Sequence, residues 1–280
     1  MPMLKMPILI SVIIPAFKAE ATLARAVASI ARQFVHSHRP DQVEVIIAAD
    51  DGGDYGFVQS MARQVKVLAA PGHGVRKGTG PGATRNRGIR ASRGQYLAFL
   101  DADDHYSDGY LDALLALARR HGAAFAPTQV ITAGGDPFIT LGADQSWLTP
   151  RDFGKWPGSF HPFLRRDLTS GFDHGAGQDV FHALEVLGQI GGRAPMAQSA
   201  HYNLNLQDGS LTAKASFGQN IDHRYQTTIQ RYHRRQTALT GTARLAAIQA
   251  LHQRRGWNKR FLAKPVEANG FYGFLAKNKK

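Results

Sequence analysis

The sequence contains no cysteine. Disulfide bridges and zinc sites with thiolate ligands are therefore excluded, and a reducing cellular compartment is compatible with the composition. Acidic residues are also in the minority, because 21 Asp and Glu stand against 34 Lys and Arg and leave a formal net charge of +13. Such a charge favours polyanionic partners, which include nucleic acid, anionic lipid headgroups and phosphorylated substrates. The charge alone does not choose among them.

Long apolar runs are missing as well. No stretch of the sequence approaches the roughly 20 apolar residues that a membrane-spanning helix needs, so we expect a soluble or peripheral protein. The apolar run at 8–14 follows Lys5 and resembles the core of a signal peptide, with a cleavage-like segment at 19–21. The run is short, β-branched and closed by Pro15, which favours a buried parallel strand instead.

The chain of 280 residues, 43% of them apolar, is long enough to bury one substantial core. Its first half alternates between strand-like runs and helical patterns. Strands are expected at 8–14, 43–49, 65–69 and 96–100, and helices at 23–34, 83–92, 110–120 and 180–187. This alternation predicts an α/β fold with a mostly parallel central sheet flanked by helices, whose ligands bind beyond the carboxyl ends of the strands. Between 125 and 163 the pattern assigns no clear elements.

Acidic residues gather where two of the expected strands end. Asp50 and Asp51 follow the second strand, and Asp101, Asp103 and Asp104 follow the fourth. Carboxylates a few ångströms apart repel one another and raise a pKa unless a cation is present, and Mg²⁺ or Mn²⁺ prefers such oxygen sites. The pattern therefore predicts a divalent metal with a phosphate ligand at this edge of the sheet.

The composition changes near residue 216, where we place the boundary between a compact domain at 1–215 and a basic helical extension at 216–280. Apolar residues of the extension recur at near-helical spacing among basic ones: Ile221, Tyr225, Ile229 and Tyr232, then Leu245, Ile248 and Leu251. These patterns predict basic amphipathic helices. Their apolar faces either dock on an anionic membrane surface or pack on the compact domain, and the sequence leaves both alternatives open.

Four segments, taken in order, resemble the successive signatures of family 2 glycosyltransferases, which have the GT-A fold. They are Ser11-Val12-Ile13-Ile14-Pro15-Ala16-Phe17, Asp50-Asp51-Gly52-Gly53, Gly82-Ala83-Thr84-Arg85-Asn86-Arg87-Gly88-Ile89 and Phe99-Leu100-Asp101-Ala102-Asp103-Asp104. The resemblance covers roughly 8–212 and continues in Gly171-Phe172-Asp173 and Gln178-Asp179. It implies transfer of a sugar from a nucleotide-sugar, with a UDP-sugar as the expected donor, to an acceptor hydroxyl.

The resemblance also implies which residues bind the nucleoside. Asp50 or Asp51 would read the uracil ring, because a carboxylate accepts a hydrogen bond from a ring N–H. Pro15 and Phe17, at the end of the first strand, would lie beside the nucleoside. The alternative for Pro15 and Phe17 is that they only terminate the strand.

The diphosphate and its metal would be held by a second group of residues. Asp101 and Asp103 match the D-x-D motif of the family, in which the first carboxylate contacts the ribose or a metal-bound water and the second binds Mn²⁺ or Mg²⁺. Arg85 and Asn86 would line the donor pocket. His201 matches a histidine that joins the metal ligands in some members. The alternative for the acidic residues is a solvated turn or a helix cap by Asp104.

Asp179 matches the general base of inverting members of the family, with Gln178 where a Glu is usual. A base is needed because the acceptor hydroxyl must lose its proton as it attacks the anomeric carbon. The alternative for Asp179 is a cap on the helix that follows, and the two roles are compatible.

The expected acceptor is a polysaccharide or a lipid-linked oligosaccharide at the cytoplasmic face of a membrane, and nucleic acid is not expected as a partner. The sequence is less compatible with three other classes of protein. An aspartate-dependent phosphohydrolase would carry its acidic motif on the first strand, and a nucleotidyltransferase would show a basic Gly-rich motif there. A non-enzymatic binder of nucleic acid or another polyanion would explain the charge but would leave the aligned carboxylates without a role.

Overall fold

The computed structural model describes residues 7–36, 40–71, 78–207, 215–264 and 269–278. Within these ranges the main sheet has six strands in the order β3-β2-β1-β4-β10-β6. Their bounds are β1 Ile10–Ala16, β2 Val43–Ala49, β3 Val65–Leu68, β4 Tyr96–Phe99, β6 Ala123–Ala124 and β10 Phe163–Arg165. The first four pair in parallel and β10 pairs antiparallel with β4 and β6. The prediction of a mostly parallel α/β sheet is confirmed.

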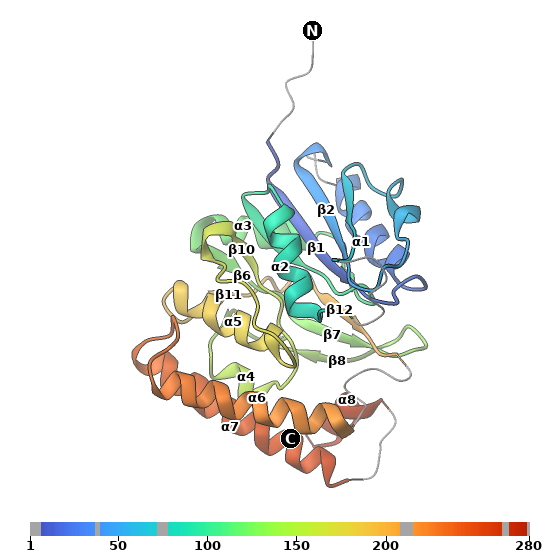
Figure 1. The fold of residues 1–280 in the computed structure, drawn as a ribbon. Coiled ribbons are helices and arrows are strands. Elements are labelled where there is room, and N and C mark those ends of the chain that lie inside the picture. The colour runs from blue at the N-terminus through green and yellow to red at the C-terminus, as the bar shows by residue number, and fades with distance from the viewer. Residues whose placement is uncertain (1–6, 37–39, 72–77, 208–214, 265–268, 279–280) are drawn as a thin grey trace.

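Helices cover both faces of this sheet (Figure 1). Those packed on it are α1 Leu23–His36, α2 Pro81–Ala91, α3 Tyr110–His121 and α5 Gln178–Gln189. Alternate residues of β1 point to opposite faces, so Val12 packs in one core with α1 and α3 while Ile13 packs in another with α2 and α5. The result is three layers, helices on a sheet on helices.

A second sheet lies below the carboxyl ends of the parallel strands, in the region that the sequence pattern left unassigned (Figure 1). Its order is β5-β12-β7-β8, with β5 His105–Tyr106, β12 Tyr202–Asn205, β7 Thr128–Ile131 and β8 Pro137–Leu141. The remaining short elements are β9 Trp147–Leu148, β11 Ala194–Pro195, α4 Asp152–Lys155 and single 3-10 turns at Pro40–Gln42, Gly56–Val58 and Arg166–Leu168. Strands of only two to five residues carry almost no periodic signal.

The described part of the extension contains three helices, α6 Ala215–His233, α7 Gly241–Leu262 and α8 Gly270–Asn278, beneath the rest of the molecule (Figure 1). Their apolar faces are buried against the compact domain, which is one of the two alternatives that the sequence left open. The shared core includes Phe125, Val130, Leu148, Val180, Leu184, Ile221, Tyr225, Ile229, Tyr232 and Leu251. Leu245 is the exception in the pattern and is 59% exposed. The boundary at residue 216 stays a prediction, although these helices share one core with residues 125–206.

A glycine allows α7 to approach closely. Gly154 on α4 faces α7, and a Cβ atom at this position would lie 2.9 Å from the Cα of Ala250 and 1.9 Å from Oε1 of Gln253. Any larger residue therefore forces the two helices to move. None of the helices in the described ranges combines the length and the apolarity that crossing a bilayer requires.

Candidate active site

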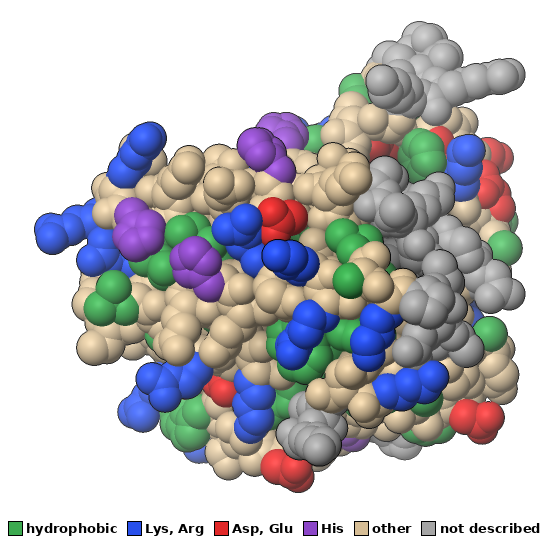
Figure 2. All heavy atoms as spheres, turned by 90° about the horizontal axis from the view of Figure 1, so that it is seen from below, with side chains coloured by type: hydrophobic (Ala, Val, Ile, Leu, Met, Phe, Trp, Pro, Cys, Tyr) green, Lys and Arg blue, Asp and Glu red, His purple; other side chains and the backbone are tan. Residues whose placement is uncertain are grey.

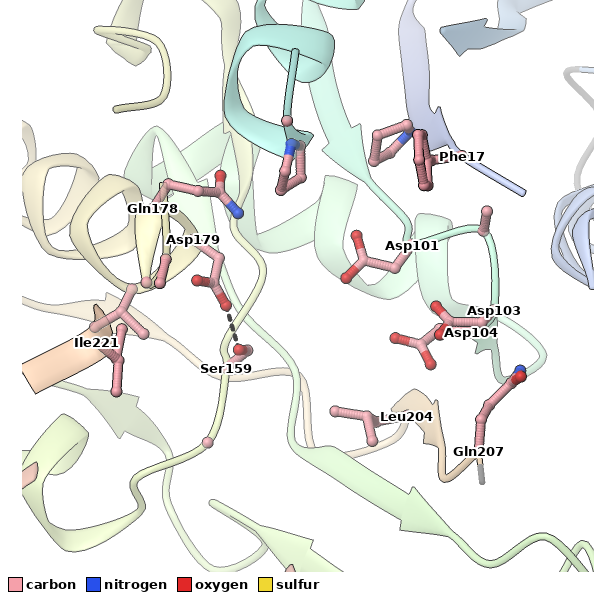
Figure 3. Close-up of a pocket in the computed structure, with 18 of the residues that line it drawn as sticks. Phe17, Asp101, Asp103, Asp104, Ser159, Gln178, Asp179, Leu204, Gln207 and Ile221 are labelled. Atoms are coloured by element: carbon pink, nitrogen blue, oxygen red, sulfur yellow. Dashed lines mark hydrogen bonds between the residues drawn. The ribbon is translucent and has the colours of Figure 1, made fainter. Parts of the chain in front are cut away.

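A cavity of about 850 Å³ opens beyond the carboxyl ends of β1, β2 and β4. One side, here called the strand-end wall, consists of the residues that follow these strands, among them Pro15, Phe17, Asp50, Asp101 and Asp103, together with Arg85 of α2. The opposite side, here called the helix wall, consists of the 157–159 segment, the first turn of α5 and residues of α6, α7 and α8. Figure 3 shows Asp179 on the helix wall across the cavity from Asp101, Asp103 and Asp104.

Arg85 brings a buried positive charge to the strand-end wall. The residue is 2% exposed, and its Nη2 forms a short ion pair with Oδ1 of Asp101. Burial by itself would raise the pKa of Asp101, but the guanidinium of Arg85 holds it below its usual value. The Nε and Nη1 atoms of Arg85 are buried without a hydrogen-bond partner in the described part of the chain. The Arg85 side chain also lines the cavity, where its positive charge would attract an anionic ligand.

Asp103 and Asp104 lie in a turn closed by the bond from the N–H of Asp104 to the carbonyl of Asp101, 3.1 Å. Burial and the charge of Asp101 raise the pKa of Asp103 to about 6. Burial and the charges of Asp103 and Asp101 likewise raise the pKa of Asp104, whose Oδ1 accepts from the N–H of Asn205 at 2.9 Å. A cation would relieve this repulsion.

The acidic turn could supply one or two ligands to a divalent metal, but not a complete set. Among the described residues, no three His, Cys, Asp or Glu side chains are placed to hold a metal ion by themselves. Mg²⁺ is commonly held by one or two carboxylates together with the phosphate oxygens of a substrate. Asp103, with its raised pKa and its place in the cavity lining, suits the first of these roles.

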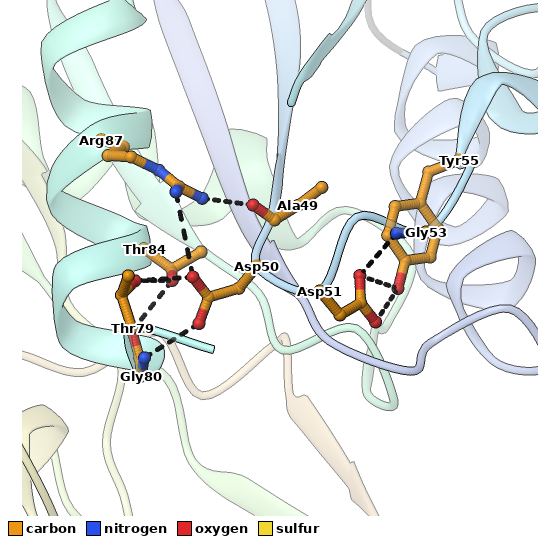
Figure 4. A network of polar contacts seen from close by, with 9 residues as sticks. All are labelled: Ala49, Asp50, Asp51, Gly53, Tyr55, Thr79, Gly80, Thr84 and Arg87. Atoms are coloured by element: carbon orange, nitrogen blue, oxygen red, sulfur yellow. Dashed lines mark hydrogen bonds and ion pairs between the residues drawn. The ribbon is translucent and has the colours of Figure 1, made fainter. Parts of the chain in front are cut away.

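Asp50 and Asp51 follow the same strand but do different things (Figure 4). Asp50 lines the cavity, where its carboxylate accepts from the hydroxyl of Thr79 at 2.6 Å and from the N–H of Gly80 at 2.8 Å. Nη1 of Arg87 lies 3.8 Å from the same carboxylate. Asp50 therefore joins the end of β2 to the start of α2 and still faces the cavity.

Asp51 turns away from the cavity and is not among the residues that line it. Its carboxylate accepts from the N–H of Gly53 at 3.0 Å, from the hydroxyl of Tyr55 at 2.9 Å and from the N–H of Lys18. Burial favours a higher pKa for Asp51, but these hydrogen bonds outweigh it and lower the pKa. Of the two carboxylates, only that of Asp50 belongs to a residue that lines the cavity.

Two other expected residues also lie outside the cavity. The side-chain amide of Asn86 is occupied by the backbone of Phe172, donating to its carbonyl at 2.9 Å and accepting from its N–H at 2.8 Å. His201 lies just before β12, where its N–H donates to the hydroxyl of Ser107 at 2.8 Å. Neither residue is part of the lining. Asn86 is a tether between α2 and the loop before α5, which the sequence motif did not reveal.

Asp179 occupies the first turn of α5. The residue that caps this helix is Gly177, at φ 73°, and no side chain makes the capping hydrogen bond, so the alternative in which Asp179 is the cap is not realised. Oδ2 of Asp179 accepts a short hydrogen bond from the hydroxyl of Ser159. The carboxylate lies on the cavity lining and faces the acidic turn (Figure 3).

The sequence reasoning missed most of the helix wall. Its lining includes Pro157, Gly158, Ser159, Ile221, Tyr225, Arg254, Asn258, Phe261, Phe271 and Tyr272. One signal was available. Arg254 stands three residues after Leu251 in the apolar row of α7, and an arginine in such a row has to find buried partners. The other lining residues carry no motif.

The sequence is similar to proteins of one known family. The sequence model of the family described as Glycosyl transferase family 2 matches residues 11–176. The succinoglycan biosynthesis protein ExoO of Rhizobium meliloti is 26% identical over 230 residues, which are 72% of this chain and 62% of ExoO. The GalNAc(5)-diNAcBac-PP-undecaprenol beta-1,3-glucosyltransferase of Campylobacter jejuni is 25% identical over 57% of this chain and 52% of its own length. The matches thus span less than two thirds of these relatives.

Solved structures share the fold. S. aureus TarS (residues 1–349), solved in complex with UDP-GlcNAc, superposes with a TM-score of 0.63 over 88% of this chain and 72% of the TarS chain, at 14% sequence identity. At this identity the likeness concerns the fold alone. The GT-A fold that the sequence motifs implied is confirmed.

Proposed function

The chain belongs to glycosyl transferase family 2, and on this basis we propose that it transfers a sugar, with inversion, from a UDP-sugar to a hydroxyl of a saccharide acceptor. The observation that carries the proposal is the arrangement of the cavity, in which Asp101 and Asp103 face Asp179 across the space that a donor would fill (Figure 3). The two walls carry the two kinds of group that the reaction needs. One kind binds a charged diphosphate, and the other accepts a proton.

The donor would lie along the strand-end wall. Asp50 is free to accept from the N–H of a uracil ring, because a carboxylate accepts up to about four hydrogen bonds and Asp50 uses two. The positive charge of Arg85 on the cavity lining suits diphosphate oxygens. TarS, which shares the fold, was solved with UDP-GlcNAc, and this supports a nucleotide-sugar donor.

A divalent metal, Mn²⁺ or Mg²⁺, would be held by Asp103, with Asp101 close by. When bound, it would stabilise the negative charge that grows on the diphosphate as the bond to the sugar breaks. Arg85 contributes a fixed positive charge to the same place.

Asp179 would remove the proton from the acceptor hydroxyl. The hydroxyl oxygen forms a bond to the anomeric carbon, the bond from that carbon to the diphosphate oxygen breaks, and UDP leaves with the electron pair. Attack from the side opposite to the leaving group inverts the anomeric centre. A positioned base of this kind is typically worth about 10² to 10⁴ in rate.

The acceptor would be a polysaccharide or a lipid-linked oligosaccharide. One relative acts in succinoglycan biosynthesis and another is named for an undecaprenol-linked acceptor. The charge of this chain fits work beside an anionic membrane, since residues 216–280 carry 13 Lys and Arg against two Asp and Glu, or +11 of the net +13. Exposed basic side chains include Arg234, Arg235, Lys259 and Arg260, and the face of α6–α8 seen in Figure 2 has far more basic than acidic side chains.

Membrane attachment would therefore be electrostatic and peripheral, at the cytoplasmic face, because the apolar faces of these helices are buried. Co-sedimentation with phosphatidylglycerol vesicles, compared with phosphatidylcholine vesicles, measures it. We expect binding to the anionic vesicles only, weakened by salt and by Lys259→Glu with Arg260→Glu. The same change at Arg119 and Arg120, exposed on α3, is the control. Equal binding to both vesicle types would contradict the proposal.

The first test of the donor site is calorimetric titration of UDP with and without Mn²⁺. We expect tight binding only with the metal, and its loss in Asp103→Asn. Asp108→Asn is the matched control, because the side chain of Asp108 is 71% exposed and lies outside the cavity. If UDP bound under neither condition, the UDP donor would be wrong and other nucleotides would be titrated next.

A further inference from the structure

Arg254 is a buried cation on the helix wall. It is 5% exposed, and no described Asp or Glu forms an ion pair with it. A buried charge without a counter-ion is costly unless each of its donors is satisfied by a hydrogen bond. The partners of Arg254 therefore indicate why a charge is kept at this place.

The guanidinium of Arg254 donates most of its hydrogen bonds to backbone carbonyls of α4 and of the loop that follows it. Nη1 donates to the carbonyls of Phe153 and Gly158 at 3.0 Å each, and Nη2 donates to the carbonyl of Pro157 at 3.2 Å. Nε donates to the hydroxyl of Tyr225 at 2.9 Å. Because a guanidinium is planar and its donors are fixed in direction, these bonds set the orientation of the 157–158 peptides and not only their position.

The next residue in the chain is Ser159, which contacts Asp179. The carbonyl of Ser159 accepts from the hydroxyl of Thr128 at 2.7 Å, so three consecutive carbonyls of this loop are held by side chains. The hydroxyl of Ser159 then donates to Oδ2 of Asp179 (Figure 3). A continuous path of hydrogen bonds and one short stretch of backbone leads from α7 to the proposed base.

The extension also holds the other side of Asp179. Asp173, in the loop that precedes α5, accepts from Nη1 of Arg231 at 2.6 Å, and Nη2 of Arg224 lies 3.5 Å away. Both arginines belong to α6. The two segments that flank the base are thus fixed by basic residues of the extension.

We propose that Ser159 and Arg254 are positioning residues for sugar transfer, Ser159 by orienting the carboxylate of Asp179 and Arg254 by orienting the loop that carries Ser159. The proposal rests on the proposed function, in which Asp179 accepts the proton of the acceptor. It makes the C-terminal extension part of the catalytic apparatus.

The experiment compares Ser159→Ala, Arg254→Gln and the double variant. The assay follows UDP release from UDP-GlcNAc, or from the UDP-sugar of a panel that reacts fastest, with water as acceptor. Misplacing a reacting group by about 1 Å can cost up to about 100-fold in rate, so we expect each single variant to lose about 10- to 100-fold in kcat. The KM for the donor and the Kd of UDP should not change, because neither residue is on the strand-end wall.

Two further results separate positioning from mere stability. The double variant should be no slower than the slower single variant, because both changes break the same path. Ser159→Thr, which keeps the hydroxyl, should restore most of the rate. Arg255→Gln is the matched control. Arg255 is the next residue on α7, its Nε lies 2.9 Å from Oδ1 of Asp222, and it does not line the cavity. We expect it to retain the wild-type kcat.

Hydrogen exchange in the protein without ligand gives a readout that needs no activity. The backbone amides of the peptide covering 156–163 should exchange faster in Arg254→Gln than in the wild type. Their exchange rate should be unchanged in Arg255→Gln. Wild-type kcat in Ser159→Ala, or multiplied losses in the double variant, would overturn the proposal, and Ser159→Ala remains informative if Arg254→Gln fails to fold. Asp179→Asn distinguishes the two levels: an active Asp179→Asn refutes the base itself, whereas an inactive one beside a fully active Ser159→Ala refutes only the positioning.

Discussion

The two walls of the cavity are built in opposite ways. The strand-end wall gathers several charges within a few residues of three strand ends, and burial together with the interactions among these charges shifts the pKa values of Asp101, Asp103 and Asp104. The helix wall presents the single carboxylate of Asp179, held by one hydroxyl from Ser159. Crowded charges suit the binding of a charged ligand, and a single fixed carboxylate suits the transfer of one proton. The contrast predicts that damage to the two walls will appear in different measurements.

The largest expected effect is on the helix wall. Asp179→Asn removes the proposed base and should lower the rate of sugar transfer by about 10² to 10⁴. The affinity for UDP should stay unchanged, because Asp179 lies across the cavity from Asp101 and Asp103, which are proposed to bind the donor (Figure 3). Steady-state kinetics and UDP titration measure the two quantities. Asp167→Asn, which alters an exposed carboxylate paired with Arg165, is the control. Normal transfer by Asp179→Asn would remove the distinction between the walls.

The strand-end wall should give the reverse result. Asp50→Asn replaces a carboxylate that faces the cavity, and the loss of one charged hydrogen bond of about 1.5–3 kcal/mol predicts roughly 10- to 100-fold weaker UDP binding. Asp51→Asn changes the neighbouring carboxylate, which accepts hydrogen bonds from Gly53 and Tyr55 and does not line the cavity. It should lower thermal stability without weakening UDP binding. Calorimetry on the pair checks this. Weaker binding in Asp51→Asn alone would reverse the assignment.

A smaller effect, on stability, is expected from a change at Glu44. This residue lies near the start of β2, at the end of the strand opposite to the strand-end wall. Burial favours a higher pKa for Glu44, but hydrogen bonds from Ser11 and from Arg93 outweigh it and lower the pKa. Arg93 is largely exposed, so we expect Glu44→Gln to cost only about 1 kcal/mol of unfolding free energy at pH 7.

The pH dependence of this effect has a definite sign. Because the pKa of Glu44 is lower in the folded than in the unfolded chain, its stabilisation is present above the unfolded pKa of about 4.3 and is lost as the pH falls through the folded pKa. Urea unfolding of both proteins should show a gap at pH 7 that closes below about pH 4. A gap that persisted in acid would show that the charge of Glu44 is not the cause.

The smallest effect concerns the support of the helix wall. Gly154→Ala places a Cβ against α7 at Ala250, and the overpacking of about 1–3 kcal/mol is partly offset by about 1 kcal/mol of better helix propensity. Gly256→Ala on α7 has no neighbour within 4 Å and should be slightly stabilising. Thermal unfolding of the two variants should therefore shift in opposite directions. A shift of the same sign in both would mean that the α4–α7 approach is not tight.

The difference between the walls also explains what could be predicted from the sequence. Asp50, Asp101 and Asp103 follow their strands directly, so the strand pattern alone placed them at one edge of the sheet. Nothing local distinguished Asp51 from Asp50, because both stand in the same turn, and only the path of the chain near Lys18 and Tyr55 shows which of them turns away.

The helix wall could not be predicted in the same way. Ser159, Asp179 and Arg254 are brought together by packing between segments that are 20 to 95 residues apart in the sequence, and no periodicity encodes such contacts. Asp179 was found through a family motif and not through the pattern around it. Asn86 lies inside a motif too, yet it holds Phe172 and does not line the cavity. The same motif therefore contains Arg85, which lines the cavity, and Asn86, which does not.

The burial of Arg254 has a practical consequence for protein engineering. Exchanging the C-terminal helices between related transferases is an attractive way to change the acceptor, since these helices supply Ile221, Tyr225, Phe261 and Tyr272 to the cavity. A foreign α7 without an arginine at the position of Arg254 would leave the carbonyls of Phe153, Pro157 and Gly158 without their donor. A functional hybrid would need the 157–159 loop and α7 to be exchanged together, because the side chain of one orients the backbone of the other.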